Sequence, residues 1–203
     1  MSEFFVQIPE EEVISALCGR KTISEIQRNK WAIASTLDIY TLTFPKITPR
    51  MTEIEVAEIM QAEVEERGLG YAQAKNNNPA VNSGPDSPVC HNAPTDIKIE
   101  RGHLLHFDFG VKQNNYCADI QRMVYFCKPG EKSAPEAVQR EFITVVQAIQ
   151  AAFKIIKPGL QGIEVDAANR RVLIGAGCPG YKYATGHQVG RLAHDGGCIL
   201  GPG

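Results

Sequence analysis

The 203-residue sequence lacks the features that would mark a membrane protein or a disulfide-stabilised one. No apolar run approaches the ~20 residues that a membrane-spanning helix needs, and the start, MSEFFVQIPEEEVISAL, has acids where a signal peptide would be positive. No C-x-x-C pair occurs among the six cysteines, which argues against a structural zinc site and a small disulfide scaffold. We therefore expect a soluble, cytoplasmic protein with free thiols and no membrane partner.

An excess of basic residues is also missing, since 21 Lys and Arg are set against 23 Asp and Glu. A nucleic-acid-binding domain would present a basic stripe, so the formal net charge of −2 predicts no nucleic-acid partner. Small neutral or peptide-like ligands fit this charge better. The length suits a single sizeable core.

Four helices are predicted from capping signals and from the spacing of apolar residues. The stretches Thr22-Ile-Ser-Glu25 and Thr52-Glu-Ile-Glu55 are capping boxes that open the first two helices. Ser133-Ala-Pro-Glu136 is predicted to cap a long third helix, and Ile163 to Gly175 forms the fourth.

Two strands are predicted between the helix pairs, at Leu104 to Val111 and at Tyr116 to Phe126. They follow Gln73 to Pro88, a stretch rich in Asn, Pro, Ser and Gly that we expect to form a long irregular loop. The order helix, helix, strand pair then begins again with the third and fourth helices, which indicates an internal structural repeat. Few residues follow Gly175, so the second half-repeat is expected to be truncated.

Each predicted strand carries one aspartate, Asp108 or Asp119. If Gln113 and Asn114 form a two-residue turn, these carboxylates lie directly opposite each other on one face of the hairpin. Like charges at that separation are destabilising, so something must offset the repulsion. Water, or an arginine such as Arg122, could do so, and so could a pair of divalent cations bridged by the carboxylates. A metal site would need further ligands, for which histidine is the obvious candidate.

Three of the five histidines lie in distinctive settings. His187 and His194 belong to GHQVGRLAH, and His91 follows the polar stretch in VCH. These blocks, with HFDFG and the later YCADIQR, resemble the pita-bread metallopeptidases, which comprise methionine aminopeptidases, Xaa-Pro aminopeptidases and prolidases. The resemblance covers about Arg20 to the last residue. The sequence DFG, together with the arginine of YCADIQR, is more similar to the Xaa-Pro branch than to the methionine branch.

The resemblance implies an α+β pita-bread (creatinase/aminopeptidase) fold of two helix-helix-strand-pair half-repeats, the second of them truncated. It implies that Asp108, Asp119 and His187 bind two divalent metal ions (Mn, Co or Zn), with Asp119 bridging them. It also implies that His194 contacts the scissile carbonyl or the developing oxyanion, and that His91 lies near the leaving amide nitrogen. The expected activity is hydrolysis of the N-terminal Xaa-Pro bond of a peptide substrate, and a homodimer is implied by the resemblance alone.

The sequence departs from this family where two further glutamate ligands are expected, because no glutamate follows Glu164. Asp195 takes the position after the second histidine that is usually glutamate, and the resemblance does not make it a ligand. We favour a fragment of a longer enzyme, with residues 1–20 as a linker-like segment and 21–203 as a catalytic-type domain that lacks its last strands. An open sheet edge and an incomplete core support this preference.

Three other functions remain open from the sequence. The missing glutamates fit a non-catalytic pita-bread module that binds a peptide or a protein, and a methionine aminopeptidase shares the motifs. A metal-free creatinase-like hydrolase shares the fold, but it would have little use for Asp108 and Asp119 side by side.

Overall fold

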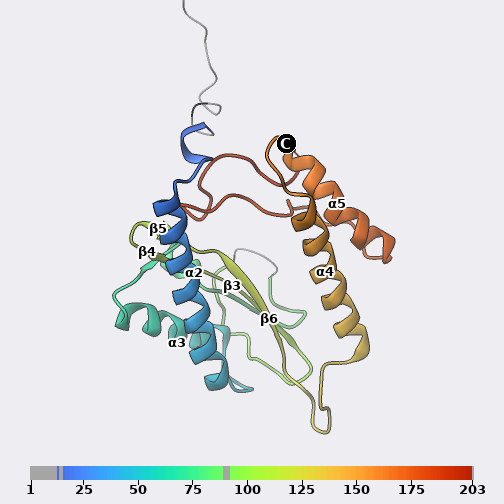
Figure 1. Ribbon diagram of the computed structural model, residues 1–203. Helices are drawn as coiled ribbons and strands as arrows, with labels where there is room; N and C mark the ends of the chain where they lie inside the picture. Colours follow the sequence, from blue (N-terminus) through green and yellow to red (C-terminus); the bar gives the residue numbers. More distant parts are fainter. Residues whose placement is uncertain (1–12, 14–15, 89–91, 203) are drawn as a thin grey trace, which may run out of the picture. The chain divides into compact units, whose positions relative to one another are not determined.

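The computed structural model describes residues 13, 16–88 and 92–202, which fall into two compact units (Figure 1). The hairpin unit consists of Thr22–Ala134 and Val189–Ala193. The helix-pair unit consists of Pro135–Gln188, the residues from His194 onward and the described residues up to Lys21. None of the helices in the described part of the chain combines the length and the apolar content that a bilayer crossing needs.

The hairpin unit begins with the two helices that the capping boxes predict. Helix α2 spans Ile23–Thr43 and helix α3 spans Glu53–Glu66. In both, the N-cap threonine side chain accepts from the N3 amide, and the N3 glutamate accepts from the N-cap amide. Two donors that a helix end leaves without intrahelical partners are thereby satisfied, so both predicted capping boxes are confirmed.

The described strands of this unit form two antiparallel three-stranded sheets. Their orders are β1 (Gly70–Tyr71), β4 (Val111–Gln113), β5 (Tyr116–Cys117) in one and β2 (Ala80–Ser83), β3 (Leu104–Phe109), β6 (Ile120–Tyr125) in the other. Each of the two predicted strands is therefore broken in two, because pairing changes sheet at Gly110 on one side and at Ala118 and Asp119 on the other. A Cβ at Gly110 would lie 1.7 Å from the Ala118 carbonyl oxygen, so the break requires glycine.

The prediction of an irregular loop over residues 73–88 is wrong in part. Ala80–Ser83 forms strand β2, in which all four residues are buried and paired with β3. The polar groups of this segment find partners: the Ser83 amide donates to Glu53 Oε1 at 2.6 Å, and Asn82 Nδ2 donates to the Pro88 carbonyl at 2.9 Å. A polar sequence can be buried when such partners exist, and composition alone does not reveal them.

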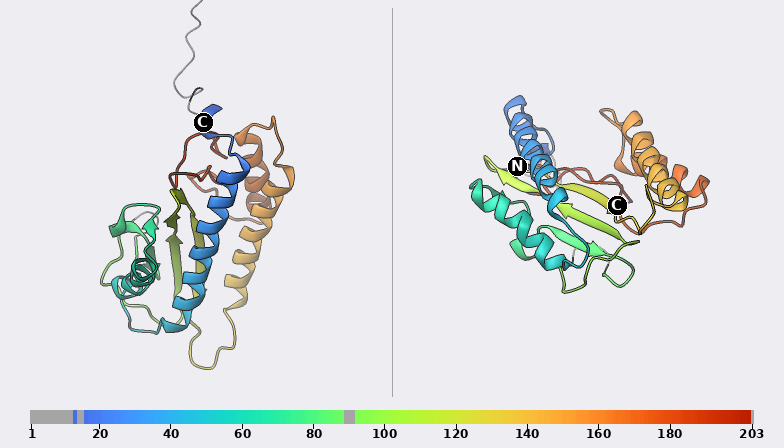
Figure 2. Two further views of the ribbon diagram at one scale, coloured as in Figure 1. Left: turned by 60° about the vertical axis from the view of Figure 1, so that its left-hand side comes forward. Right: turned by 90° about the horizontal axis from the view of Figure 1, so that it is seen from below.

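The core of the hairpin unit lies between the helices and the strands. Helix α2 runs lengthwise along the strands, with α3 beside them (Figure 2). The residues of this core with no exposed surface come from both helices, from β2, β3 and β4, and from the segment before β3: Ala32, Ile39, Val56, Met60, Val64, Val81, Ile99, Leu105, Phe107 and Val111. Alternate residues of β3, Leu105 and Phe107, thus face this core.

The helix-pair unit contains α4 (Glu136–Ile155) and α5 (Gly162–Gly175), which lie side by side (Figure 1). The capping box predicted at Ser133 is wrong, because Pro135 is the N-cap of α4 and no side-chain cap bond forms there. Proline disfavours helical backbone at the residue before it, so the helix cannot begin at Ala134. Helix α5 instead carries a capping box, between Gln161 and Glu164.

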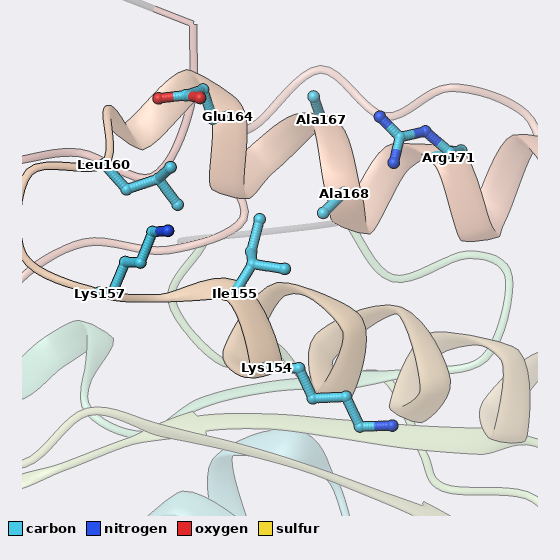
Figure 3. Close-up of a pocket in the computed structure, with 8 residues that line it drawn as sticks. All are labelled: Lys154, Ile155, Lys157, Leu160, Glu164, Ala167, Ala168 and Arg171. Atoms are coloured by element: carbon cyan, nitrogen blue, oxygen red, sulfur yellow. The ribbon is translucent and has the colours of Figure 1, made fainter.

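The described residues after α5 form no ladder of strands within the helix-pair unit. A single isolated bridge joins Gly186 to Leu200, so the second half-repeat lacks the strand set of the first. A cleft of about 630 Å³ lies between α4 and α5 (Figure 3). In that view Lys154 and Arg171 extend from different helices and their charged ends do not converge.

Candidate functional site

The turn between β4 and β5 fixes how the two aspartates meet. The turn residues are Asn114 and Asn115, with φ of 51° and 64°, and Gln113 pairs with Tyr116. The predicted turn at Gln113 and Asn114 is therefore wrong by one residue. A two-residue hairpin turn of this kind needs positive φ at both central positions, which asparagine tolerates well and glutamine does not.

The changed turn makes Asp108 and Asp119 diagonal neighbours and not direct partners. Asp108 pairs with Gln121, and continuing this register places Gly110 opposite Asp119. Because the register moves by two residues in the partner strand, both aspartates stay on the same face. The prediction of direct opposition is wrong, and the prediction of a shared face is confirmed.

The two carboxyl groups interact strongly with each other in a largely buried position. Asp108 is 6% exposed. Burial, followed by the charge of Asp108 and a hydrogen bond with it, raises the pKa of Asp119 to about 7. Near neutral pH the pair therefore holds a proton that isolated carboxyl groups would have lost. A cation at this position would relieve the same repulsion.

Helix α2 supports the hairpin through polar side chains on one of its faces. Asn29 Nδ2 donates to the Cys117 carbonyl at 2.9 Å, Thr36 Oγ1 accepts from the Val111 amide at 3.2 Å, and the Tyr40 hydroxyl donates to the Ile120 carbonyl at 2.8 Å. Burial, and then the charge of Asp108, raises the pKa of Tyr40 well above its usual value. The backbone on both sides of Asp119 is thus held by α2.

Asn78 supports the strand break beside the aspartates. Its Nδ2 donates to the Gly110 carbonyl at 2.7 Å and its Oδ1 accepts from the Gly110 amide at 3.3 Å. Asn78 is buried, and one side chain thereby satisfies both backbone groups of the residue at which the ladder is interrupted. Neither Asn78 nor Tyr40 was predicted, since side-chain bonds to distant backbone leave no local sequence pattern.

The two histidines of GHQVGRLAH come together within the helix-pair unit. Their rings stack with centroids 3.8 Å apart and an angle of 19° between planes. His187 Nδ1 lies 3.2 Å from the Gln188 carbonyl oxygen, which can only accept a hydrogen bond. A neutral His187 therefore carries its proton on Nδ1 and its lone pair on Nε2, which is the arrangement of a metal-ligating histidine.

The structure thus brings the predicted residues together in two pairs, Asp108 with Asp119 in the hairpin unit and His187 with His194 in the helix-pair unit. His91 lies outside the described residues. Two neighbouring carboxylates and an imidazole whose Nε2 carries the lone pair are ligands that Mn, Co and Zn accept. By chemistry, the residues present fit a divalent metal.

The sequence profile of metallopeptidase family M24 matches residues 31–202. The chain belongs to metallopeptidase family M24. An uncharacterised peptidase, YqhT of Bacillus subtilis strain 168, is 32% identical over 192 residues, which are 93% of this chain and 51% of that protein. The Xaa-Pro dipeptidase of Pyrococcus furiosus is 29% identical over 187 residues, 91% of this chain and 51% of that protein.

Solved structures of similar proteins confirm the α+β pita-bread fold of this M24 chain. The X-Pro aminopeptidase from Thermotoga maritima MSB8 has a TM-score of 0.81 and 28% identity, over 94% of this chain and 52% of that one. The prolidase from Pyrococcus furiosus has a TM-score of 0.81 and 26% identity. The chain spans about half the length of these M24 relatives, which include Xaa-Pro aminopeptidases and prolidases.

Proposed function

We propose that the chain belongs to a metal-dependent aminopeptidase that hydrolyses the N-terminal Xaa-Pro bond of peptides. One observation carries the proposal: Asp108 and Asp119 lie on one face of a hairpin with a pKa of about 7 for Asp119. Structural carboxyl groups do not need that proximity, whereas a pair of divalent cations does. Family membership and the Xaa-Pro relatives support the same activity.

In this proposal the residues have separate roles. Asp108, Asp119 and His187 would hold two divalent ions, which when bound supply hydroxide at neutral pH for attack on a carbonyl. His194, stacked on His187, would donate to the scissile carbonyl as negative charge develops on its oxygen. His91 would lie near the leaving amide nitrogen. Tyr40, Thr36 and Asn78 would keep the aspartates in place.

Titration with Mn, Co and Zn, followed by assays on Xaa-Pro and Met-Xaa peptides, tests the proposal. We expect metal binding that the double variant Asp108→Ala, Asp119→Ala abolishes, and hydrolysis of the Xaa-Pro peptides in preference to the Met-Xaa peptides. Preference for Met-Xaa peptides would indicate a methionine aminopeptidase. Wild-type protein that binds none of the three metals would contradict the proposal that the chain belongs to a metal-dependent enzyme.

A second candidate is a pita-bread module that binds a peptide or protein without cleaving it. It is favoured by one observation, the lack of any glutamate after Glu164 in the 203 residues. A chain that binds metal and an Xaa-Pro peptide but releases no product would support it. A cytoplasmic location, in line with the absence of a disulfide among the five described cysteines, and a homodimer complete the first proposal.

A further inference from the structure

Lys21 contacts the two residues that directly follow the stacked histidines. Its Nζ forms an ion pair with Asp195 Oδ2 at 3.1 Å and donates to Gln188 Oε1 at 3.0 Å. A third bond goes to the Cys18 carbonyl at 2.8 Å. Gln188 follows His187 and Asp195 follows His194, so one ammonium group links the two histidine positions.

The three acceptors match the three protons of the Lys21 ammonium. The side chains of Lys21 and Asp195 are 14% and 10% exposed. Withdrawing both charges from water is costly, and the cost is offset only when the remaining polar groups have partners, as all three donors of Lys21 have here. The exposed pair Lys46–Glu63, in which the lysine side chain is 51% exposed, has no such requirement.

The loop that carries the histidines is closely packed around the side chain of Gln188. The Asp195 amide donates to the Gln188 carbonyl at 3.2 Å, and a Cβ at Gly197 would lie 2.9 Å from Gln188 Nε2. The Gln188 side chain therefore has little room to move, and its amide oxygen faces Lys21. Movement of Lys21 would therefore change the distance between the backbone beside His187 and the backbone beside His194.

The other end of this loop is held by a different network. Asp166 of α5 accepts from the Thr185 amide at 3.1 Å and from the Thr185 hydroxyl at 2.7 Å, and it pairs with Arg170. Arg170 in turn donates to the Tyr181 carbonyl at 2.6 Å. The chain entering the loop at Gly186 is thus fixed without Lys21, so loss of Lys21 would loosen the histidine pair without releasing the whole segment.

We propose that Lys21 is a positioning residue that sets the spacing of His187 and His194. Its consequence for catalysis rests on the proposed function, because His187 acts there as a metal ligand and His194 as a donor to the carbonyl. The positioning itself does not depend on that function and can be measured without metal or substrate.

The test uses Lys21→Met, which keeps an unbranched side chain one heavy atom shorter and removes the charge, with Lys46→Met as the matched control. The metal-free protein is exposed to diethyl pyrocarbonate, and the labelling rate of each histidine is read by mass spectrometry. We expect labelling of His187 and His194 to rise about tenfold in Lys21→Met, the scale of a lost charged hydrogen bond. Labelling of His106, which lies in β3 of the hairpin unit, should stay unchanged and serves as internal reference. Lys21→Arg, which keeps charge and donors, is expected to restore most of the protection.

Mn²⁺ titration of the same variants gives a second readout. We expect affinity to fall about 10-fold or more in Lys21→Met, as for other residues that orient metal ligands, and to stay unchanged in Lys46→Met. Equal labelling of His187 and His194 in the two methionine variants would overturn the role of Lys21. So would a rise that includes His106, which would indicate general loosening. Wild-type protein that binds no Mn²⁺ but shows the labelling difference would contradict the proposed function and leave the role of Lys21 standing.

Discussion

The aspartates and the histidines of the candidate site are held by two different kinds of structure. Asp108 and Asp119 lie on a hairpin whose backbone is paired on both sides of the strand break and bonded to α2. His187 and His194 lie in a loop that belongs to no described strand ladder and has few backbone bonds, and the side chains of Lys21 and Asp166 hold its two ends. The first pair therefore depends mainly on backbone geometry and the second more on a few charged groups, so different substitutions should disrupt the two pairs.

The largest difference should come from two glycines with nearly the same close contact. An added Cβ would lie 1.7 Å from the Ala118 carbonyl oxygen at Gly110 and 1.8 Å from the Ile199 carbonyl oxygen at Gly162. The Ala118 oxygen belongs to a paired hairpin that cannot shift, so Gly110→Ala should cost about 3 kcal/mol or more. Ile199 belongs to no strand, and its neighbour Leu200 forms only the isolated bridge to Gly186, so Gly162→Ala should cost less, about 1–3 kcal/mol.

Urea unfolding followed by hydrogen exchange measures this loss in each unit separately. Gly175→Ala is the control, since nothing lies within 4 Å of an added Cβ there. Equal losses of stability for Gly110→Ala and Gly162→Ala would mean that the two regions are equally rigid, which would contradict the difference described above.

Loss of a charge should damage the helix-pair unit most at Asp166, which is buried. Asp166→Ala leaves Arg170 and both Thr185 donors without their acceptor and should cost about 3 kcal/mol, with the exchange of amides 181–188 rising most. Asp166→Asn keeps one oxygen acceptor and should cost less. An alanine variant as stable as wild type would show that the loop is held in another way.

The matching test in the hairpin unit removes an uncharged amide. Asn78→Ala deletes both bonds to Gly110 inside the core and should cost about 2 kcal/mol, measured by the urea midpoint. Asn76→Ala, at an exposed position in the short helix η2 (Lys75–Asn77) that ends directly before Asn78, should change little. If both variants unfold at the same midpoint, Asn78 does not support the strand break.

The smallest expected effect is a pH dependence of the free energy of unfolding of the metal-free protein. Because the folded protein raises the pKa of Asp119 from 3.8 to about 7, it binds a proton that the unfolded chain releases. This contribution to the free energy of unfolding is complete below pH ~4 and is lost as the pH rises through about 7. The full shift would correspond to about 4 kcal/mol, and screening by solvent at this half-buried carboxyl reduces it to about 1–2 kcal/mol. The variant Asp119→Asn should remove this fall in the free energy of unfolding between pH 5 and pH 8, as measured by urea unfolding. An unchanged slope would show that another group is responsible.

Local signals in the sequence predicted much of the fold. The threonine-glutamate pairs at Thr22 and Thr52 begin helices because their bonds span only three residues, and alternation along residues 104–109 predicts the buried face of β3. The capping box at Ser133 failed because Pro135 constrains the residue before it. The turn was misplaced because its type depends on which residues tolerate positive φ, and only Asn114 and Asn115 both do.

The missing parts of the prediction depend on residues far apart in the sequence. The polar half of strand β2, Asn82 and Ser83, is buried because Glu53, the Pro88 carbonyl and the pairing with β3 satisfy its polar groups. Lys21 and Gln188 are separated by 167 positions, so no local pattern links them. The aspartates and histidines were identified by their residue types within motifs, whereas the side chains that hold them could not be.

The short segment Val189–Ala193 has a consequence for how the protein is made. The Cys117 amide donates to the Gly190 carbonyl at 2.7 Å, and the Cys117 thiol and the Arg191 carbonyl oxygen are 74 positions apart in the sequence. On a ribosome, the hairpin therefore emerges roughly 4–15 s before residues 189–193, which complete its hydrogen bonds, are synthesised. During that interval the buried amide of Cys117 lacks its acceptor, so a nascent hairpin unit should mature only once the histidine motif has been translated.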